Sequence, residues 1–266
     1  MESLPKDVRR AYQNLAEVPK YQHFVRIPDR IIQCIDYFGI ACDQVSARTR
    51  LRAYYLFIGV VDDTIDSGRI DAGRLILDNL STPAPVFGEA ARSSSVRLIT
   101  EVLKCNISED AYSLMMTKLR TLYREAVSER GATSIDSYIE HRTFVGSLTA
   151  ELSYLLIRPC LSDNSEKLCE FMKQVGAIGC LVDSLIDLGA DRRLGLLGFK
   201  PGPRDYTKLI ARILRDGLRV SHKHLGLSGL FLLAIIDNVR DRFRADHNVR
   251  QHSFVSERKD PSAGVA

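Results

Sequence analysis

Two clusters of aspartate lie inside the most apolar stretches of this chain, and they constrain how the chain can fold. The first cluster ends the apolar run 53–61, and the second follows the apolar run 175–182. The six acids are Asp62, Asp63, Asp66, Asp183, Asp187 and Asp191. A buried carboxylate without a partner is costly, so both clusters need a source of positive charge. Hard divalent cations such as Mg²⁺, which bind oxygen ligands, are the expected source.

The spacing of these acids predicts that they share helix faces. Residues four apart in a helix point the same way. Asp62 and Asp66 would therefore form a pair, and Asp183, Asp187 and Asp191 would form a row over two turns. If the two helices face each other, bridging metal ions would bind an anion such as a diphosphate, and apolar surroundings would hold a hydrocarbon tail. The plainer alternatives are a solvated helix end for the first cluster and a solvent-facing acidic stripe for the second.

The remainder of the chain is patterned for helices. Hydrophobic residues make up 45% of the 266 residues, which is enough for a substantial core. Helical periodicity is nearly continuous, and the alternating runs typical of strands are almost missing. The sequence predicts one all-α domain over residues 1–252 and a disordered polar tail over 253–266. The expected helices cover residues 5–18, 28–43, 47–66, 71–80, 92–104, 108–130, 134–158, 164–191, 205–223 and 227–250.

Local signals mark some of the boundaries. Thr133 and Asp136 fit a capping box at the start of one helix, and Pro159 ends that helix. Two loops rich in Pro and Gly interrupt the helical pattern, at residues 81–88 and 197–205. The second loop directly follows the second acidic cluster, which makes it a candidate lid over an active site.

Composition excludes several classes of protein. The net charge is only +4, and the 37 Lys and Arg are scattered, so no nucleic-acid surface is indicated. The six cysteines form no C-x-x-C pair, which favours free thiols in a reducing compartment. The N-terminus lacks a secretion signal, and the longest apolar run, 225–236, is too short to span a bilayer. The sequence predicts a cytoplasmic protein without a transmembrane segment, and it leaves the oligomeric state open, with a homodimer as one option.

Both acidic segments resemble motifs of one enzyme family. Residues 55–66 read Tyr-Leu-Phe-Ile-Gly-Val-Val-Asp-Asp-Thr-Ile-Asp, which resembles the Y-x-F-x-R-x-x-D-D-x-x-D segment of squalene and phytoene synthases. Residues 183–195 resemble their N-I-x-x-D-x-x-x-D-x-R-x-G segment. The resemblance covers residues 45–195, with specific motifs at its two ends. It implies the helical bundle of class I isoprenoid synthases, a central apolar cavity, a prenyl diphosphate substrate and Mg²⁺-assisted departure of its diphosphate.

Further site residues are expected around this centre. The candidates for binding the diphosphate are Arg48, Arg142, Arg192, Arg193, Lys200 and Tyr206. The candidates for lining the cavity are Tyr55, Phe57, Tyr138, Phe144, Gly146 and Gly179. Guanidinium groups match phosphate oxygens, and aromatic faces stabilise carbocations. Arg142 lies among apolar neighbours and needs an anionic partner, either Glu151 or a ligand phosphate. The plainer interpretation of the aromatic side chains is core packing, and that of the glycines is close contact between helices.

Several functions are compatible with this pattern. We expect a Mg²⁺-dependent class I terpene synthase that ionises one prenyl diphosphate and captures the carbocation internally. A close rival is head-to-head condensation of two prenyl diphosphates. Gly59, Leu194 and Leu196 replace family arginines, and two diphosphates require more cations than one, which favours the cyclase. The other classes are a non-catalytic assembly factor that resembles phytoene synthases, and an unrelated metal-dependent diphosphate hydrolase.

Overall fold

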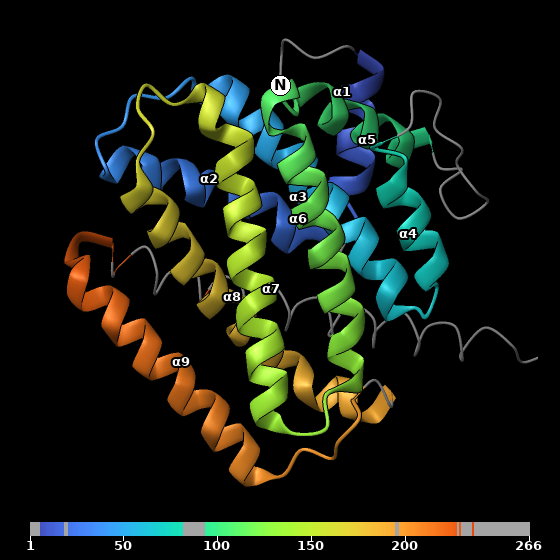
Figure 1. The fold of residues 1–266 in the computed structure, drawn as a ribbon, viewed down its shortest axis with the longest axis vertical. Coiled ribbons are helices and arrows are strands. Elements are labelled where there is room, and N and C mark those ends of the chain that lie inside the picture. Colours follow the sequence, from blue (N-terminus) through green and yellow to red (C-terminus); the bar gives the residue numbers. More distant parts are fainter. Residues whose placement is uncertain are drawn as a thin grey trace, which may run out of the picture.

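The computed structural model describes residues 6–18, 21–81, 94–194, 197–227, 229 and 236, and these ranges form a bundle of helices (Figure 1). Its α-helices are α1 (Lys6–Ala16), α2 (Gln22–Tyr37), α3 (Gln44–Asp66), α4 (Ile70–Asp78), α5 (Ser94–Asn106), α6 (Glu109–Ser128), α7 (Ile135–Ile157), α8 (Glu166–Leu194) and α9 (Pro203–Lys223). Short 3-10 turns are η3 (Glu129–Gly131), η4 (Arg158–Cys160) and η5 (Leu225–Leu227). Within the described ranges, extended pairing is limited to an isolated bridge between Cys42 and Leu161. The predicted all-α class is confirmed.

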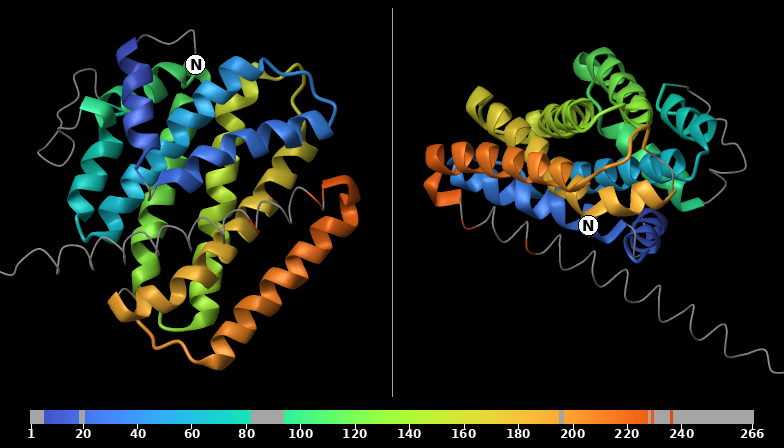
Figure 2. Two further views of the ribbon diagram at one scale, coloured as in Figure 1. Left: turned by 180° about the vertical axis from the view of Figure 1, so that it is seen from behind. Right: turned by 90° about the horizontal axis from the view of Figure 1, so that it is seen from below.

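The helices are arranged around α3 and α7. In Figure 1, α9 lies along one edge of the bundle, and α4 and α5 lie at the opposite edge. Seen from behind, α2 and α3 cross the far face of the bundle (Figure 2). α7 contacts both α3 and α8, and α9 contacts α8. Among the described helices, none is long and apolar enough to cross a membrane.

α3 occupies the core because it is apolar around most of its circumference. Its residues 53–57 are all buried, and Leu51 and Tyr54 are fully enclosed. A helix that is hydrophobic on all sides must be surrounded by other elements. The Tyr54 hydroxyl donates a hydrogen bond to the Thr149 carbonyl oxygen of α7 at 3.1 Å, so the buried phenol is satisfied. The acidic cluster at the end of α3 therefore lies at the margin of the core.

Two predicted boundaries differ from the structure for local reasons. α2 begins at Gln22, because Pro28 is accommodated inside the helix, and it ends at Tyr37 instead of residue 43. Gly39 has a φ of +67°, a left-handed conformation that terminates helices and favours glycine. The N-cap of α7 is Ser134, not Thr133, because its hydroxyl accepts a hydrogen bond from the Ser137 amide at 3.2 Å. The predicted tail 253–266, residues 82–88 of the first loop and almost all of the predicted helix 227–250 lie outside the described residues.

α7 and α8 make their closest approach at a pair of glycines. A Cβ atom on Gly146 would overlap the carbonyl oxygen of Gly176 and would lie 2.6 Å from the Cβ of Cys180. A Cβ on Gly176 would lie 2.6 Å from the Cβ of Ala150. Gly146 therefore permits contact between two backbones, and the space beside it is already filled. This finding corrects its assignment to a cavity wall.

Gly146→Ala is expected to lower the free energy of unfolding by about 1–3 kcal/mol, because the methyl group overpacks this crossing. Gly179→Ala is the matched control on the facing helix. Its Cβ would meet no atom within 4 Å, and alanine favours helix by about 1 kcal/mol over glycine. Urea denaturation of both variants measures the difference. Equal stabilities would contradict the close crossing.

Candidate functional site

The first acidic cluster lies on the last two turns of α3, and its members have separate partners. Asp63 Oδ2 is 3.5 Å from Arg69 Nη2. The Tyr21 hydroxyl also hydrogen-bonds the Asp63 carboxylate, and its pKa is raised to about 12, chiefly by burial and further by the charge of Asp63. Asp66 Oδ1 is 3.7 Å from Arg130 Nη2. Each of these two carboxylates therefore faces an arginine of this chain.

Asp66 is the more solvated of these acids. Desolvation raises its pKa above the ordinary value, and the charges of Arg130 and Arg142 oppose the rise. The side chain nevertheless remains 65% exposed, so water screens its ion pair, and we assign that pair little stabilising energy. Asp66 does not need a metal ion to offset a burial cost, contrary to the expectation from its apolar neighbours in the sequence.

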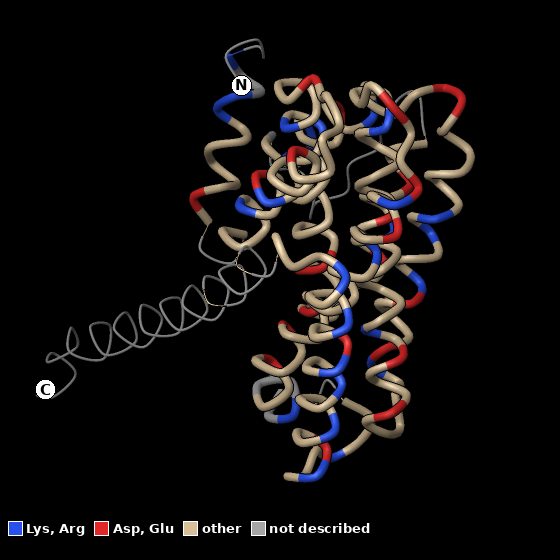
Figure 3. The backbone as a smooth tube through the Cα atoms, turned by 90° about the vertical axis from the view of Figure 1, so that its left-hand side faces the viewer, with Lys and Arg blue, Asp and Glu red and all other residues tan. Residues whose placement is uncertain are grey.

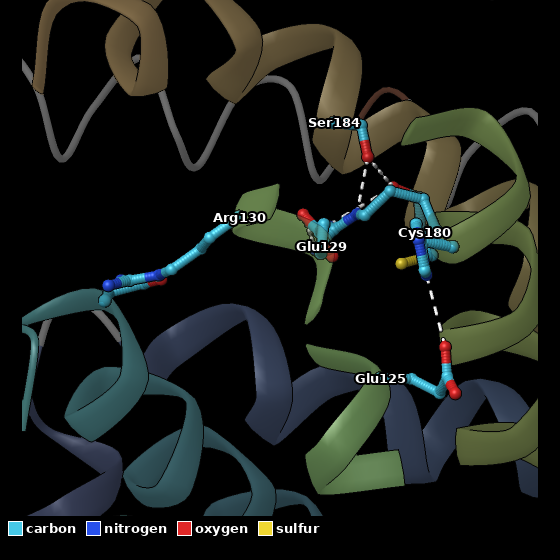
Figure 4. A network of polar contacts seen from close by, with 8 residues as sticks. Glu125, Glu129, Arg130, Cys180 and Ser184 are labelled. Atoms are coloured by element: carbon cyan, nitrogen blue, oxygen red, sulfur yellow. Dashed lines mark hydrogen bonds and ion pairs between the residues drawn. The ribbon is translucent and has the colours of Figure 1, made fainter. Parts of the chain in front are cut away.

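A largely enclosed arginine, whose side chain is 19% exposed, forms the centre of the site. Arg142 of α7 donates from Nε to the Ser184 hydroxyl at 2.7 Å, and its Nη1 lies 3.3 Å from each carboxylate oxygen of Glu129. Ser184 in turn donates to the Cys180 carbonyl oxygen at 2.7 Å. Figure 4 shows Glu129, Cys180 and Ser184 around this network, with Arg130 directed away from them. The guanidinium thus joins η3, α7 and α8.

The partner of Arg142 differs from the expected one. The sequence suggested Glu151 or a ligand phosphate, but Glu129 from η3 takes this role. Glu151 instead pairs with Lys118, with 3.0 Å between Oε1 and Nζ. Glu151 lies nine positions after Arg142 in α7, and nine residues of helix span about 13 Å. That separation along the helix accounts for the incorrect expectation.

The negative charge around Arg142 includes an acid of the first cluster, and the neighbouring Cys180 lies near an acid of each cluster. Burial alone lowers the pKa of Arg142, but nearby acidic groups, including Glu129 and Asp62, hold it well above its ordinary value. Burial raises the pKa of the Cys180 thiol to about 12, Arg142 opposes this, and the charges of Asp183 and Asp62 add to it. Asp62 from α3 and Asp183 from α8 therefore act on the same buried spot. The convergence of the two motifs on a shared ligand stays a prediction.

The remainder of the second cluster continues along α8 away from Arg142. Asp187 lies one turn beyond Asp183 and is partly buried. The side chains of Asp191 and Arg193 lie outside the described part of the structure. The hydroxyl of Tyr206, on α9, would be 3.4 Å from a Cβ at Gly189, so this phenol lies against the same stretch of α8.

The predicted lid is attached to the bundle through several contacts. Arg192 Nη1 donates to the Pro201 carbonyl oxygen at 3.1 Å. A Cβ on Gly198 would lie 2.7 Å from the Ala132 carbonyl oxygen, and the ring of Phe199 lies 6.1 Å from that of Tyr138. Residues 197–202 are thus held against the start of α7. Lys200 is exposed on this loop.

Arg48 does not belong to this site. It lies fourteen residues before Asp62 in α3, which is about 21 Å along a helix. Its Nε is 3.1 Å from Asp29 Oδ1 of α2, an ion pair at the other end of the molecule. Because α3 is one continuous helix, the separation is fixed, and the assignment of Arg48 to a diphosphate is corrected.

The expected cavity residues fall into different environments. Phe57 and Tyr138 are fully buried, and Tyr55 accepts a hydrogen bond from the Ser153 hydroxyl at 3.0 Å. Phe144 is 47% exposed on the surface of α7, so it does not line an enclosed space. Among these expected cavity residues, Gly179 has free space beside it, since an added Cβ would meet no atom within 4 Å. The central cavity itself stays a prediction.

Gly59 shows why the motif arginine of the resembled family has no place here. A Cβ on Gly59 would lie 2.7 Å from the ring of Phe24 and 3.3 Å from the ring of Tyr21. Both rings belong to the segment that covers this face of α3. A longer side chain would have to displace them.

Two properties of the acids bear on a metal ion: the chemistry of their donor atoms and the distance between their side chains. Carboxylate oxygens are the ligands that Mg²⁺ prefers, and Asp62 and Asp183 face a common spot from different helices. Among the described side chains, no group of three or more His, Cys, Asp or Glu is close enough to hold a metal. The donor chemistry fits the ion, and a third ligand would have to come from movement of Asp187 or from Asp191.

Several residues of the site carried no signal in the sequence. Glu129 and Arg130 form a short turn before Gly131, and Tyr21 precedes α2. They resemble ordinary surface residues until the fold brings them to the acidic clusters. Ser184 could have been found, because it lies four residues after Cys180 and eight after Gly176, on the face of α8 that contacts α7.

Comparison of the chain with protein-family models, with curated proteins and with solved structures found no match.

Proposed function

We propose that this protein is a Mg²⁺-dependent class I terpene synthase that ionises a prenyl diphosphate. The observation that carries the proposal is the position of the largely enclosed guanidinium of Arg142, which donates to Ser184, the neighbour of Asp183 on α8, and lies within the electrostatic reach of Asp62 on α3. Acids from facing helices beside one cation form a polar spot at the edge of an apolar bundle. That combination suits a substrate with a diphosphate head and a hydrocarbon tail.

Asp62 and Asp183 would hold the ion, with Asp187 joining them after a movement. Bound Mg²⁺ supplies Lewis-acid stabilisation of the negative charge that develops on the departing diphosphate. Arg142 contributes a fixed positive charge whose orientation is set by Ser184 and Glu129. Such preorganised charge needs no rearrangement when the bond to the diphosphate breaks.

A single diphosphate suits the cations of this site better than two. The position of the family arginine is Gly59, which lies against Phe24, and Arg48 is paired with Asp29 far from the acids. Enclosing two polyanions without matching cations is costly. These observations favour the cyclase over the condensing enzyme.

A second candidate is a non-catalytic descendant of the same fold. It is favoured by the pairing of Asp63 with Arg69, of Asp66 with Arg130 and of Arg142 with Glu129. Acids and arginines that neutralise one another make a stable bundle without a ligand. Binding of Mg²⁺ with pyrophosphate separates the two candidates, because a ligand that binds the folded state raises the melting temperature.

The test is incubation with C10, C15 and C20 prenyl diphosphates and Mg²⁺, followed by mass spectrometry of the organic extract. We expect one pyrophosphate released per product and a product with the carbon count of its substrate. A doubled carbon count would replace the cyclase with the condensing enzyme. If no product forms and Mg²⁺ with pyrophosphate does not change the melting temperature, the result would favour the non-catalytic descendant.

A further inference from the structure

α9 has two apolar faces, and only one of them is covered. Leu209 and Val220 are buried against the bundle and attach the helix to it. On the outside, Ile210, Leu214 and Leu218 are exposed, with Leu214 58% and Leu218 70% accessible. Residues four apart share a helix face, so these three side chains form one ridge.

Two more exposed apolar side chains lie just past the end of the helix. Leu225 in η5 is 75% exposed, and a Cβ on the adjacent Gly226 would lie 2.6 Å from the ring of Tyr37. Tyr37 is itself an exposed aromatic side chain. We call Ile210, Leu214, Leu218, Leu225 and Tyr37 the outer ridge. Contiguous exposed apolar side chains mark an interaction surface more often than isolated ones do.

Positive charge accompanies the outer ridge. α9 contains six Lys or Arg and two Asp, a net charge of +4, which equals the formal net charge of the whole chain. Figure 3 looks onto this side of the bundle, with Lys and Arg in blue. Asp205 accepts from the Gly202 amide at 2.8 Å, and Asp216 pairs with Arg212 and, at 3.3 Å, with Arg215. Lys208 pairs with Asp136 of α7 at 2.7 Å, and these side chains remain at the surface. Arg215 and Arg219 are exposed beside the leucines.

The combination of positive charge and apolar side chains indicates which kind of partner would bind this surface. A second copy of the chain would bring two surfaces of +4 together, and like charges across an interface are unfavourable. An anionic lipid surface satisfies both features, because apolar side chains enter the boundary between headgroups and acyl chains while basic side chains meet the phosphates. Tyr37 suits the same boundary, where aromatic rings with a polar tip are enriched.

We propose that α9 and the outer ridge bind the surface of an anionic lipid bilayer, with the helix lying in the plane of the interface. The proposal is independent of the proposed function, since it involves none of the residues around Arg142.

The test is cosedimentation of the full chain with vesicles of phosphatidylcholine alone and of an equal mixture with phosphatidylserine. We expect binding to the anionic vesicles only. Neutralising Arg215 and Arg219 together (Arg215→Gln, Arg219→Gln) is expected to weaken it roughly tenfold or more. Leu214→Ser with Leu218→Ser should weaken it to a similar degree, and high salt should release the protein.

Matched controls lie on other helices. Leu114→Ser removes an exposed leucine of α6, and Arg74→Gln removes an exposed arginine of α4. Both should bind like the parent protein. Equal binding to neutral vesicles, equal loss in the controls, or capture only by an acidic protein would overturn the proposal. So would dimers in solution that Leu214→Ser with Leu218→Ser abolishes, without vesicle binding by the parent.

Discussion

Replacing Arg142 with methionine is expected to lower the free energy of unfolding by about 3–5 kcal/mol, because it leaves the Glu129 carboxylate buried without its partner. The two side chains are only 19% and 14% exposed, so water cannot take over the role of the guanidinium. The Ser184 hydroxyl would also lose the donor at 2.7 Å. Urea denaturation followed by circular dichroism measures the change.

Two further variants make this result specific. Arg142→Met combined with Glu129→Met removes both charges and should recover much of the loss, since a buried pair can often be replaced by apolar side chains at little net cost. Arg74→Met removes the exposed partner of Asp71 and should change stability by less than about 0.5 kcal/mol. A small effect of Arg142→Met alone would show that the network does not stabilise the bundle.

The helices were predictable because their signals are local. α7 and α8 were placed within one or two residues at most ends, from apolar periodicity and from Pro159. The predicted helix 28–43 differs from α2 at both ends, because α2 begins at Gln22 with Pro28 inside it and ends at Tyr37, just before Gly39. A glycine at this position is a local signal for the end of a helix, so the end of α2 was predictable from the sequence.

The site was predictable only in part because its acids are local patterns and its cations are not. The spacing of Asp62 and Asp183 with their neighbours indicated shared helix faces, and in the structure the charges of both act on the Cys180 thiol. Arg130 pairs with Asp66 across 64 positions of sequence, and nothing in the sequence signals that contact. The premise that the acids require a divalent cation was therefore too strong, since arginines of the chain already offset some of the charge.

Gly59 and Gly146 give a second reason why the site was only partly predictable from the sequence. Gly146 was expected either to line a cavity or to allow close contact between helices, and Gly59 was expected to mark the loss of a family arginine. The structure fills both positions, Gly59 with the ring of Phe24 and Gly146 with the backbone of Gly176. A missing side chain indicates close approach, but which group approaches depends on tertiary packing.

If the proposed function is correct, Asp62→Asn should lower kcat with a prenyl diphosphate by roughly a hundredfold or more, the scale found when one preorganised electrostatic group is removed from an active site. Asn keeps the size of the side chain but removes the charge that faces Arg142 and that would hold Mg²⁺. Asp187→Asn should have the same effect from α8. Both variants should keep the helical circular dichroism of the parent protein, because the core around α3 is unchanged.

The matched control is Asp71→Asn, an acid of α4 that is 92% exposed and should leave turnover unchanged. The comparison separates loss of a ligand charge from a general loss of negative charge. Full activity in folded Asp62→Asn and Asp187→Asn would contradict the two-motif site, although the protein would still be an enzyme that acts on prenyl diphosphates. In that case the grouping of Asp62 and Asp183 near Cys180 would be structural, and the largely enclosed guanidinium of Arg142 would serve only to join α7, α8 and η3.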